Sequence, residues 1–443
     1  MSTHTPDEPN RQEPEAPGAS AQLDPDPRDP VTADAAKVDQ VVGDAGAGGS
    51  GLAARARRRI PWPDLFVTLG ALVLAFVAGA ILMVVSDPEI AGKWAYFFDR
   101  PLDALSASWD KVSSAYGALF SGSLGSWNAF THTTAQAAGL ISAGLGIGLA
   151  FRAGLFNIGG QGQAVWGAIA AAWVGFTLTG LPLVVHLPLA ILAGVAAGAI
   201  WGGIVGVLKA RTGAHEVIVT IMMNYIATGI LAWLLTTTAF QRPGRSDPIS
   251  PAVEWTATFP RLEGGQLHVG FLLALLAAVV VWWLMERTAL GFQIRAVGAN
   301  PHASATAGMS VPTITVVTMM LSGALAGLAG VQAALGPIAA ATPTPLSAGL
   351  VGTIGFDAIT VALLGRSRPV GIVLAGLLFG AMHAGGLRMQ SIAQTPLDLT
   401  YVLQALIVIF VAAPLLVKTL LPFLKARVRS RPATAATAEG GLA

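Results

Sequence analysis

The stretch LFVTLGALVLAFVAGAILMVV, residues 65–85, is almost entirely apolar and carries no charged side chain. A helix needs roughly 20 mostly apolar residues to cross the hydrocarbon core of a bilayer. The stretch follows Arg55, Arg57, Arg58 and Arg59, and basic residues favour the cytoplasmic side of a membrane. The pattern therefore predicts a signal anchor whose N-terminal flank is cytoplasmic.

The composition of the whole chain agrees with a membrane protein. Of its 443 residues, 53% are hydrophobic and 11% are charged, and the mean hydropathy is +0.64. A soluble domain carries about 25% charged residues, because it must cover its surface with polar groups. The chain has no cysteine, which excludes disulfides, thiolate metal sites and a cysteine nucleophile.

Nine further apolar segments follow the first, so we predict an all-α polytopic membrane bundle of about ten helices. The predicted spans are residues 65–85, 132–151, 163–179, 188–208, 216–236, 269–285, 313–335, 351–365, 369–387 and 398–417. In this topology sixteen Lys and Arg residues flank the inner side and seven the outer side. The positive-inside rule then predicts that both termini are cytoplasmic.

The second span enters the membrane from outside and the seventh from inside. Such opposed halves are typical of the inverted repeats of transporters, in which the solute path lies at the interface of the repeats. We therefore expect a possible inverted repeat in this chain.

The two ends of the chain differ in charge. Residues 1–50 hold ten acidic and three basic side chains and are rich in Pro, Ala, Gly and Ser, a composition that cannot bury enough apolar surface to fold. No signal peptide is expected, since residues 7–17 read DEPNRQEPEAP. We predict a disordered acidic cytoplasmic tail (1–58), a transmembrane domain (59–420) and a basic cytoplasmic tail (421–443).

Two predicted outer segments, 86–131 and 237–268, are long and contain Trp, Phe and Pro among scattered charges. Aromatic rings favour the headgroup layer of a bilayer. These segments are expected to include short interfacial helices, or to be passive connectors.

Residues 152–163, RAGLFNIGGQGQ, break the apolar pattern between two predicted spans. Each glycine lowers helix propensity by about 1 kcal/mol, and polar side chains are expensive in lipid. The segment is either an interrupted helix that presents Asn157, Gln161 and Gln163 to a polar solute, or a simple cytoplasmic turn. The sequence favours neither.

Other polar residues fall inside predicted spans. An ionised Asp357 costs about 2.5–3.5 kcal/mol at a helix centre, so it should face a cavity or a polar partner. Asn224 is a second candidate, although a lone Asn in a membrane helix more often packs helices together. His383 and Gln332 are weaker candidates. Glu216, at a helix start, is explained by the helix dipole.

Residues 286–312 form a polar inner loop that is longer than a simple connector needs. We predict a short helix along the inner surface, in which Leu290 and Ile294 form an apolar strip beside Arg287 and Arg295. This surface could dock a partner, or the arginines could only enforce orientation.

Enzyme motifs are missing from the sequence: it has no phosphate-binding G-x-x-x-x-G-K-[ST] loop, no H-E-x-x-H and no nucleophile elbow. Its seven histidines are dispersed. We expect no metal, no cofactor and no nucleic acid, and any ATPase that drives transport would be a separate chain.

Five blocks in order resemble the branched-chain amino acid and simple-sugar permeases of ABC importers, most closely those of nucleoside uptake systems. The blocks are AFRAGLFNIGGQGQ (150–163), EVIVTIMMNYIA (216–227), TALGFQIRAVGANPHASATAGM (288–309), LSGALAGLAG (321–330) and GFDAITVALLG (355–365). The resemblance covers roughly residues 65–415. The family more often carries Glu where this chain has Gln161.

The resemblance implies a cell-membrane permease subunit of an importer for nucleosides. Its partners would be a second, homologous permease, a cytoplasmic ATPase, an extracytoplasmic solute-binding lipoprotein and membrane lipids. The polar path would contain Asn157, Gln161, Gln163, Asn224 and Asp357. Coupling to the ATPase would fall to the inner loop, at Arg287, Thr288, Leu290, Gly291, Arg295, Gly298, Asn300 and Gly308.

Two other solute classes and one other mechanism stay open at this point. Simple sugars or branched-chain amino acids would use the same machinery. An ion-coupled secondary transporter would need intramembrane carboxylates, for which Asp357 is the only candidate.

Overall fold

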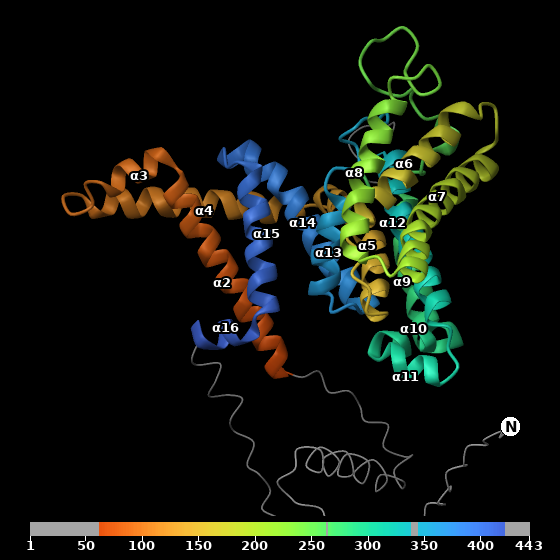
Figure 1. Ribbon diagram of the computed structural model, residues 1–443. Coiled ribbons are helices and arrows are strands. Elements are labelled where there is room, and N and C mark those ends of the chain that lie inside the picture. Colours follow the sequence, from red (N-terminus) through yellow and green to blue (C-terminus); the bar gives the residue numbers. More distant parts are fainter. Residues whose placement is uncertain (1–61, 263–264, 338–343, 421–443) are drawn as a thin grey trace, which may run out of the picture. The chain divides into compact units, whose positions relative to one another are not determined.

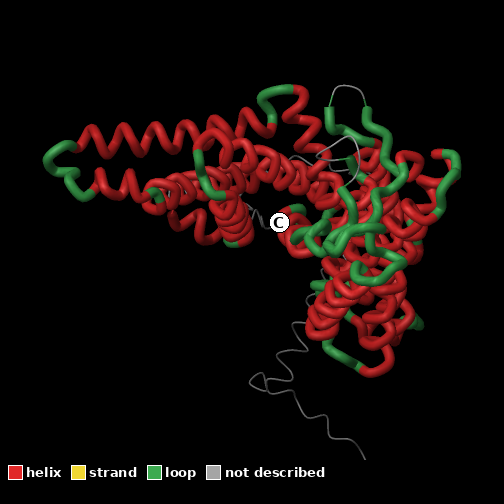
Figure 2. Tube along the Cα trace, turned by 90° about the horizontal axis from the view of Figure 1, so that it is seen from above, coloured by secondary structure: helices red, strands yellow, loops and turns green. Residues whose placement is uncertain are grey.

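The computed structural model describes residues 62–262, 265–337 and 344–420, and these residues are mainly helical (Figures 1 and 2). The predicted acidic tail (1–58) and basic tail (421–443) lie outside the described residues. Within the described ranges the only β contact is an isolated bridge between Arg261 and His268. The all-α prediction is confirmed.

Seven described helices are long and apolar enough to cross a membrane. They are α2 (Trp62–Ser86), α5 (Trp127–Arg152), α7 (Leu183–Thr212), α8 (Glu216–Leu234), α9 (Val269–Arg287), α12 (Val311–Leu335) and α14 (Pro369–Ala393). Each corresponds to a predicted span.

The other three predicted spans contain shorter helices: α6 (Gly160–Thr177), α13 (Ile354–Leu364) and α15 (Leu397–Ala412). At 1.5 Å per residue, the 11 residues of α13 rise about 16 Å, roughly half the hydrocarbon thickness. α15 ends before Pro414, which begins α16 (Pro414–Leu420), because proline has no N–H to continue a helix. The count of ten spans is therefore not confirmed, and the inverted repeat stays a prediction.

The outer segments differ from one another. Residues 86–131 form α3 (Pro88–Trp94) and α4 (Pro101–Ser123), and α4 is longer than the short helix expected there. Asp87 caps α3 and pairs with Lys111 of α4 at 2.8 Å, and the hydrogen bond from Lys111 lowers the pKa of the Asp87 carboxyl. The described part of 237–268 consists of the 3₁₀ turn η1 (Trp255–Ala257), the isolated bridge and loops.

The inner loop 286–312 folds as predicted into a short helix, α10 (Ala289–Ala299), followed by a turn and α11 (Pro301–Thr306). Thr288 caps α10 by accepting a hydrogen bond from the Gly291 amide. Asn300 caps α11 by accepting one from the Ala303 amide. The polar residues of this loop thus end one helix and begin the next.

Helices α6, α7 and α12 pack closely through glycines. A Cβ at Gly327 of α12 would lie 2.7 Å from the Gly194 carbonyl oxygen and 3.0 Å from the Gly198 Cα of α7. Gly194, Gly198, Gly202 and Gly206 recur every four residues and so share one face of α7. Small residues at this spacing let the backbones of membrane helices approach each other.

Candidate functional site

The residues that join α5 to α6 are held by a network of buried amides. Asn157 is fully buried and donates to the Gln163 Oε1 at 3.0 Å and to the Ser322 Oγ of α12 at 2.8 Å. Its own Oδ1 accepts from the Gly159 amide at 2.9 Å. Gln163 is also fully buried. Because these groups satisfy one another, they fix the turn rather than present free polar atoms.

Asn224 of α8 holds the same turn from a second side. Its Oδ1 accepts from the Gly162 amide at 2.8 Å, and its Nδ2 donates to the Ile158 carbonyl at 3.0 Å. The side chain is 6% exposed. Its contacts match the packing interpretation that the sequence also allowed.

Gln161 behaves differently, because it reaches to the start of α13. Its Nε2 donates to the Gly352 carbonyl at 2.6 Å, and its Oε1 accepts from the Gly355 amide at 2.9 Å. The first amides of a helix have no partner within the helix, so Gln161 caps α13 from a neighbouring helix. One amide therefore supplies both a donor and an acceptor.

This double role makes Gln161 sensitive to the substitution that would restore the family's commoner residue. Gln161→Glu keeps the acceptor for Gly355 but places a carboxylate oxygen against the Gly352 carbonyl oxygen. Losing a hydrogen bond within the protein costs about 0.5–1.5 kcal/mol, so we expect thermal stability of the detergent-solubilised chain to fall in Gln161→Glu and in Gln161→Ala. A melting temperature equal to wild type in both variants would contradict the capping role.

A polar cavity of about 220 Å³ opens at the first turn of α13. Asp357 lies in that turn and accepts a hydrogen bond from the Thr353 hydroxyl at 2.9 Å. The prediction placed Asp357 well inside the span 351–365. It lies instead in the first turn of the half-length helix α13, where the helix dipole favours a carboxylate. The polar lining of the cavity is Gln136, Gln332, Thr353, Asp357, His383 and Tyr401.

The cavity gathers side chains from helices distant in the sequence. Gln136 comes from α5, Gln332 from α12 and His383 from α14. Gln332 is held in place, since it donates to the Gly270 carbonyl at 2.9 Å and accepts from the Ser142 hydroxyl at 3.2 Å. The side-chain amide of Gln136 makes no hydrogen bond with the part of the chain that the structure describes.

Of the predicted path residues, the structure therefore places only Asp357 in the cavity lining. Gln161 bonds to the backbone of Gly352, which lines the cavity, and caps α13. Asn157, Gln163 and Asn224 hold the turn between α5 and α6. Gln136 and Tyr401 were not predicted. In the described ranges no group of three or more His, Asp or Glu residues could hold a metal ion.

The predicted docking strip on α10 faces the protein itself. Ile294 is fully buried and Leu290 packs against the core, because Gly291 lets α10 lie against the end of α9 and Gly298 lets it lie against the Arg152 carbonyl. The large apolar side chain that α10 exposes is Phe292, at 56%. The expectation of an exposed Leu290–Ile294 strip is wrong, since both residues belong to the inward face.

The two arginines of the loop also differ. Arg295 donates to the Met285 carbonyl and pairs with Glu286 at 3.5 Å, so it ties α10 to α9. Arg287 is exposed and lies over the Trp282 ring at 5.8 Å. Gly308 adopts a positive φ of 83° in the turn before α12, a conformation that glycine adopts without strain.

Glu286 also lies 3.9 Å from Arg152, at the end of α5. Arg152 in turn donates to the Ser367 carbonyl at 3.1 Å, in the turn between α13 and α14. A series of polar contacts thus runs from Arg295 of α10 through Glu286 and Arg152 to the turn between α13 and α14, the helices that carry Asp357 and His383. Displacement of α10 would disturb these contacts directly.

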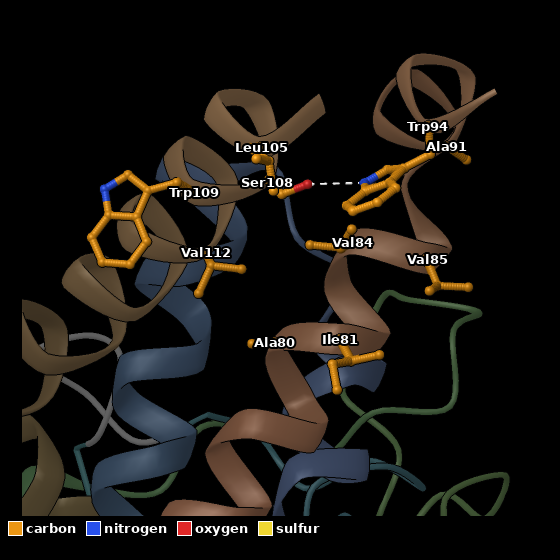
Figure 3. A pocket seen from close by; sticks show the side chains of 10 residues that line it. All are labelled: Ala80, Ile81, Val84, Val85, Ala91, Trp94, Leu105, Ser108, Trp109 and Val112. Carbon is orange, nitrogen blue, oxygen red and sulfur yellow. Dashed lines mark hydrogen bonds between the residues drawn. The ribbon is translucent and has the colours of Figure 1, made fainter. Parts of the chain in front are cut away.

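A larger pocket, about 730 Å³, lies between α2, α3 and α4 (Figure 3). Its wall is almost wholly apolar, with Ile81, Val84 and Val85 of α2 facing it, and its one internal hydrogen bond runs from the Trp94 indole to Ser108 at 3.1 Å. Exposed apolar surface of this kind suits lipid tails. It offers a polar solute few partners, so the smaller cavity at Asp357 is the better candidate.

Residues 130–412 match the model of a family described as branched-chain amino acid transport system permease component. A guanosine ABC transporter permease protein of Bacillus subtilis is 38% identical over 82% of this chain and 97% of its own length. A nucleoside ABC transporter permease protein of Lactococcus lactis is 33% identical, over 82% and 94% of the two chains. A glucose ABC transporter permease protein of Haloferax volcanii is 35% identical, over 67% and 79%.

No solved structure matches the chain significantly. The family match covers the cavity, the amide-held turn and the inner loop, and it agrees with the seven apolar helices of a multi-pass protein of the cell membrane. The chain belongs to the branched-chain amino acid transport system permease component family of ABC transporters.

Proposed function

We propose that the chain is the permease subunit of an ABC importer that moves nucleosides across the cell membrane. The observation that carries the proposal is the polar cavity around Asp357, set among apolar helices and combined with relatives named for guanosine and nucleoside transport. A carboxylate can accept hydrogen bonds from ribose hydroxyls and from the N–H groups of a base, and a free side-chain amide can accept from the same groups and donate to ribose or base oxygens.

The size of the cavity indicates how the solute would be handled. At about 220 Å³ it is smaller than the roughly 300–1,000 Å³ of typical ligand pockets. A nucleoside would fit only after the surrounding helices move apart. Such movement is what a transporter uses to expose its site to each side of the membrane in turn.

We further propose the partners of this subunit: a second homologous permease, a separate cytoplasmic ATPase and an extracytoplasmic solute-binding lipoprotein. Relatives of the chain include two different nucleoside ABC transporter permease proteins of the same Lactococcus lactis strain, which supports a paired subunit. The series of polar contacts from α10 through Glu286 and Arg152 to Ser367 supports coupling between the ATPase and the cavity, because it joins the inner loop to the cavity helices.

The orientation that this proposal requires places both termini in the cytoplasm. A reporter enzyme that folds only outside the cytoplasmic membrane, fused after Ala443, should be inactive, since sixteen basic residues flank the inner side against seven outside. The same reporter inserted after Asp247, in the exposed outer loop, should be active. Activity after Ala443 would overturn the topology.

Docking to the ATPase should depend on the exposed face of α10. Phe292→Asp puts a charge where an apolar anchor is needed, and the loss of an anchor residue typically weakens an interface by about 2 kcal/mol or more. We expect roughly a thirtyfold loss of ATPase affinity, measured by co-purification of the ATPase with the tagged chain in detergent.

The matched control is Trp255→Asp, which changes another exposed aromatic residue (74% exposed) on the predicted outer side. It should retain the ATPase. Equal ATPase recovery from Phe292→Asp, Trp255→Asp and wild type would remove α10 from the docking surface. Ile294→Asp is unsuitable, because it would bury a charge inside the chain.

A competition assay tests the solute. Vesicles that contain the full complex should take up radiolabelled guanosine, and excess adenosine or cytidine should compete more strongly than glucose or leucine. Glucose is the second candidate, because a glucose permease protein is 35% identical to the chain. Labelled guanosine uptake that only glucose or leucine suppresses would reject the nucleoside assignment.

A further inference from the structure

A second polar pocket, about 520 Å³, lies beside the cavity of Asp357. Its polar lining includes Asn128 and His132 of α5, Gln266 before α9, and Arg388 of α14. Both pockets lie between α5 and α14, which pack along each other. The same two helices therefore contribute to the walls of both pockets.

The spacing of residues on α5 shows how the pockets follow each other. Asn128, His132 and Gln136 lie four residues apart, so they form one stripe along a single face of the helix. Asn128 and His132 line the second pocket, and Gln136 lines the cavity of Asp357. The step from His132 to Gln136 is about 6 Å along the axis.

Helix α14 also contributes residues to both pockets, over about one and a half turns from His383 to Arg388. His383 lines the cavity of Asp357, while Ala384 and Arg388 line the second pocket. His132 is the last residue of α5 that lines the second pocket before Ala135 and Gln136 line the cavity, and His383 of α14 lines the cavity immediately before Ala384. The two imidazoles thus stand at the border between the pockets, one from each helix.

Some polar atoms along the contact between α5 and α14, here called the α5–α14 seam, lack protein partners. The buried Oε1 of Gln266 accepts no hydrogen bond from the described residues. The side-chain amide of Gln136, which is half-buried, makes none with them either. Buried polar groups in native proteins are nearly always paired, with protein or with water. The unpaired Gln266 oxygen indicates that the second pocket holds water or a polar solute, and the Gln136 side chain is free to bind the same species in the cavity of Asp357.

We infer that the α5–α14 seam is the outer half of the solute route. Solute enters at the pocket of Asn128 and Arg388, passes between His132 and His383, and reaches Gln136 and Asp357. This inference rests on the proposed function for the identity of the solute, and on the outward position of the α5 N-terminus. The two histidines are the constriction of the route.

The absence of native cysteine allows a direct test by thiol labelling. Single variants Asn128→Cys and Gln136→Cys, in the complete complex in sealed, right-side-out vesicles, are treated with a charged, membrane-impermeant methanethiosulfonate added outside. Labelling is counted on the tagged chain alone. The control is Ala138→Cys, two residues from Gln136 on the opposite face of α5 and fully buried.

Both seam variants should be labelled, and Ala138→Cys should react at least about tenfold more slowly, because thiol reactivity follows exposure. Adding His132→Phe to Gln136→Cys should slow labelling of Gln136→Cys by a similar factor, and adding it to Asn128→Cys should not. Gln136→Cys that reacts no faster than Ala138→Cys, or that is indifferent to His132→Phe, would overturn the route.

The solute is tested separately in the same vesicles. Guanosine supplied with the binding protein should slow the labelling of Gln136→Cys. If the wild-type complex takes up guanosine and yet guanosine leaves this labelling unchanged, the route is wrong while the function stands. If the seam is labelled as expected but no nucleoside is transported, the function is wrong while the route stands.

Discussion

Asp357→Leu is expected to reduce the initial rate of nucleoside uptake at least about tenfold, the effect of losing roughly 1.4 kcal/mol of solute or transition-state binding. Asp357 is the carboxylate among the side chains that line the cavity, and its Thr353 hydrogen bond orients it at the start of α13. Leucine has a similar size but can neither accept nor donate a hydrogen bond. Uptake is measured at equal amounts of chain in the membrane.

Asp357→Asn distinguishes charge from hydrogen bonding. An amide can still accept from Thr353, so partial uptake in Asp357→Asn with little in Asp357→Leu would show that the hydrogen bond suffices. Thr360→Leu, in the same helix but outside the cavity lining, is the control for damage to α13. Wild-type uptake in both Asp357 variants would remove the residue from the solute site.

Gly198→Leu is expected to prevent the accumulation of folded chain. A Cβ at Gly327, facing it across the α7–α12 contact, already lies 3.0 Å from the Gly198 Cα, so the two backbones leave no room for a side chain. Overpacking a core typically costs about 1–3 kcal/mol, and here the obstructing atoms are backbone that cannot rotate away. We expect a loss of more than about 3 kcal/mol, seen as aggregation on detergent extraction.

Gly229→Leu of α8 is the matched control. A Cβ at Gly229 meets nothing within 4 Å, and leucine is as favourable in lipid as in any apolar site. This variant should be extracted as a monodisperse protein, like wild type. If Gly198→Leu is as well folded as Gly229→Leu, the close glycine contact does not set the packing of α7 against α12.

The sequence predicts the long helices well, because a span is a local property of hydropathy and length. It fails at α13, where the apolar run 351–365 looks like a short span. There the first residues form a turn, and Gly352 has a positive φ of 54°. Gln161 of a distant helix supplies the cap that starts α13 at Ile354, and no local pattern reveals such a partner.

The polar path was only partly predictable for a related reason. A sequence shows that Asn157, Gln163 and Asn224 need partners in an apolar setting, but it does not show whether those partners are solute or one another. The structure pairs them within the chain. Asp357, by contrast, reaches a cavity because α13 is too short to bury it.

The stripe Asn128, His132 and Gln136 was visible in the sequence but was missed. The predicted span began at residue 132, so Asn128 was assigned to the outer segment and the other two to a helix end. The helix in fact begins at Trp127, capped by Ser126, and the four-residue spacing then becomes one face. Scanning for polar residues at helical spacing across a predicted boundary would have found it.

The inner loop shows how an amphipathic pattern can mislead about which face is free. Leu290 and Ile294 lie four residues apart and look like a docking strip. Gly291 and Gly298 allow that face to lie against the protein's own helices, so its apolar residues are buried internally. Phe292, off the strip, is left exposed.

The most direct test of the central claim is nucleoside flux in liposomes that contain the purified complex. The account predicts that labelled guanosine accumulates only when ATP is present on the ATPase side and the binding protein is present on the other. Accumulation should persist when ionophores collapse the proton and sodium gradients, and it should be lost in Asp357→Leu. Accumulation without ATP that ionophores abolish would contradict the account and identify an ion-coupled transporter instead.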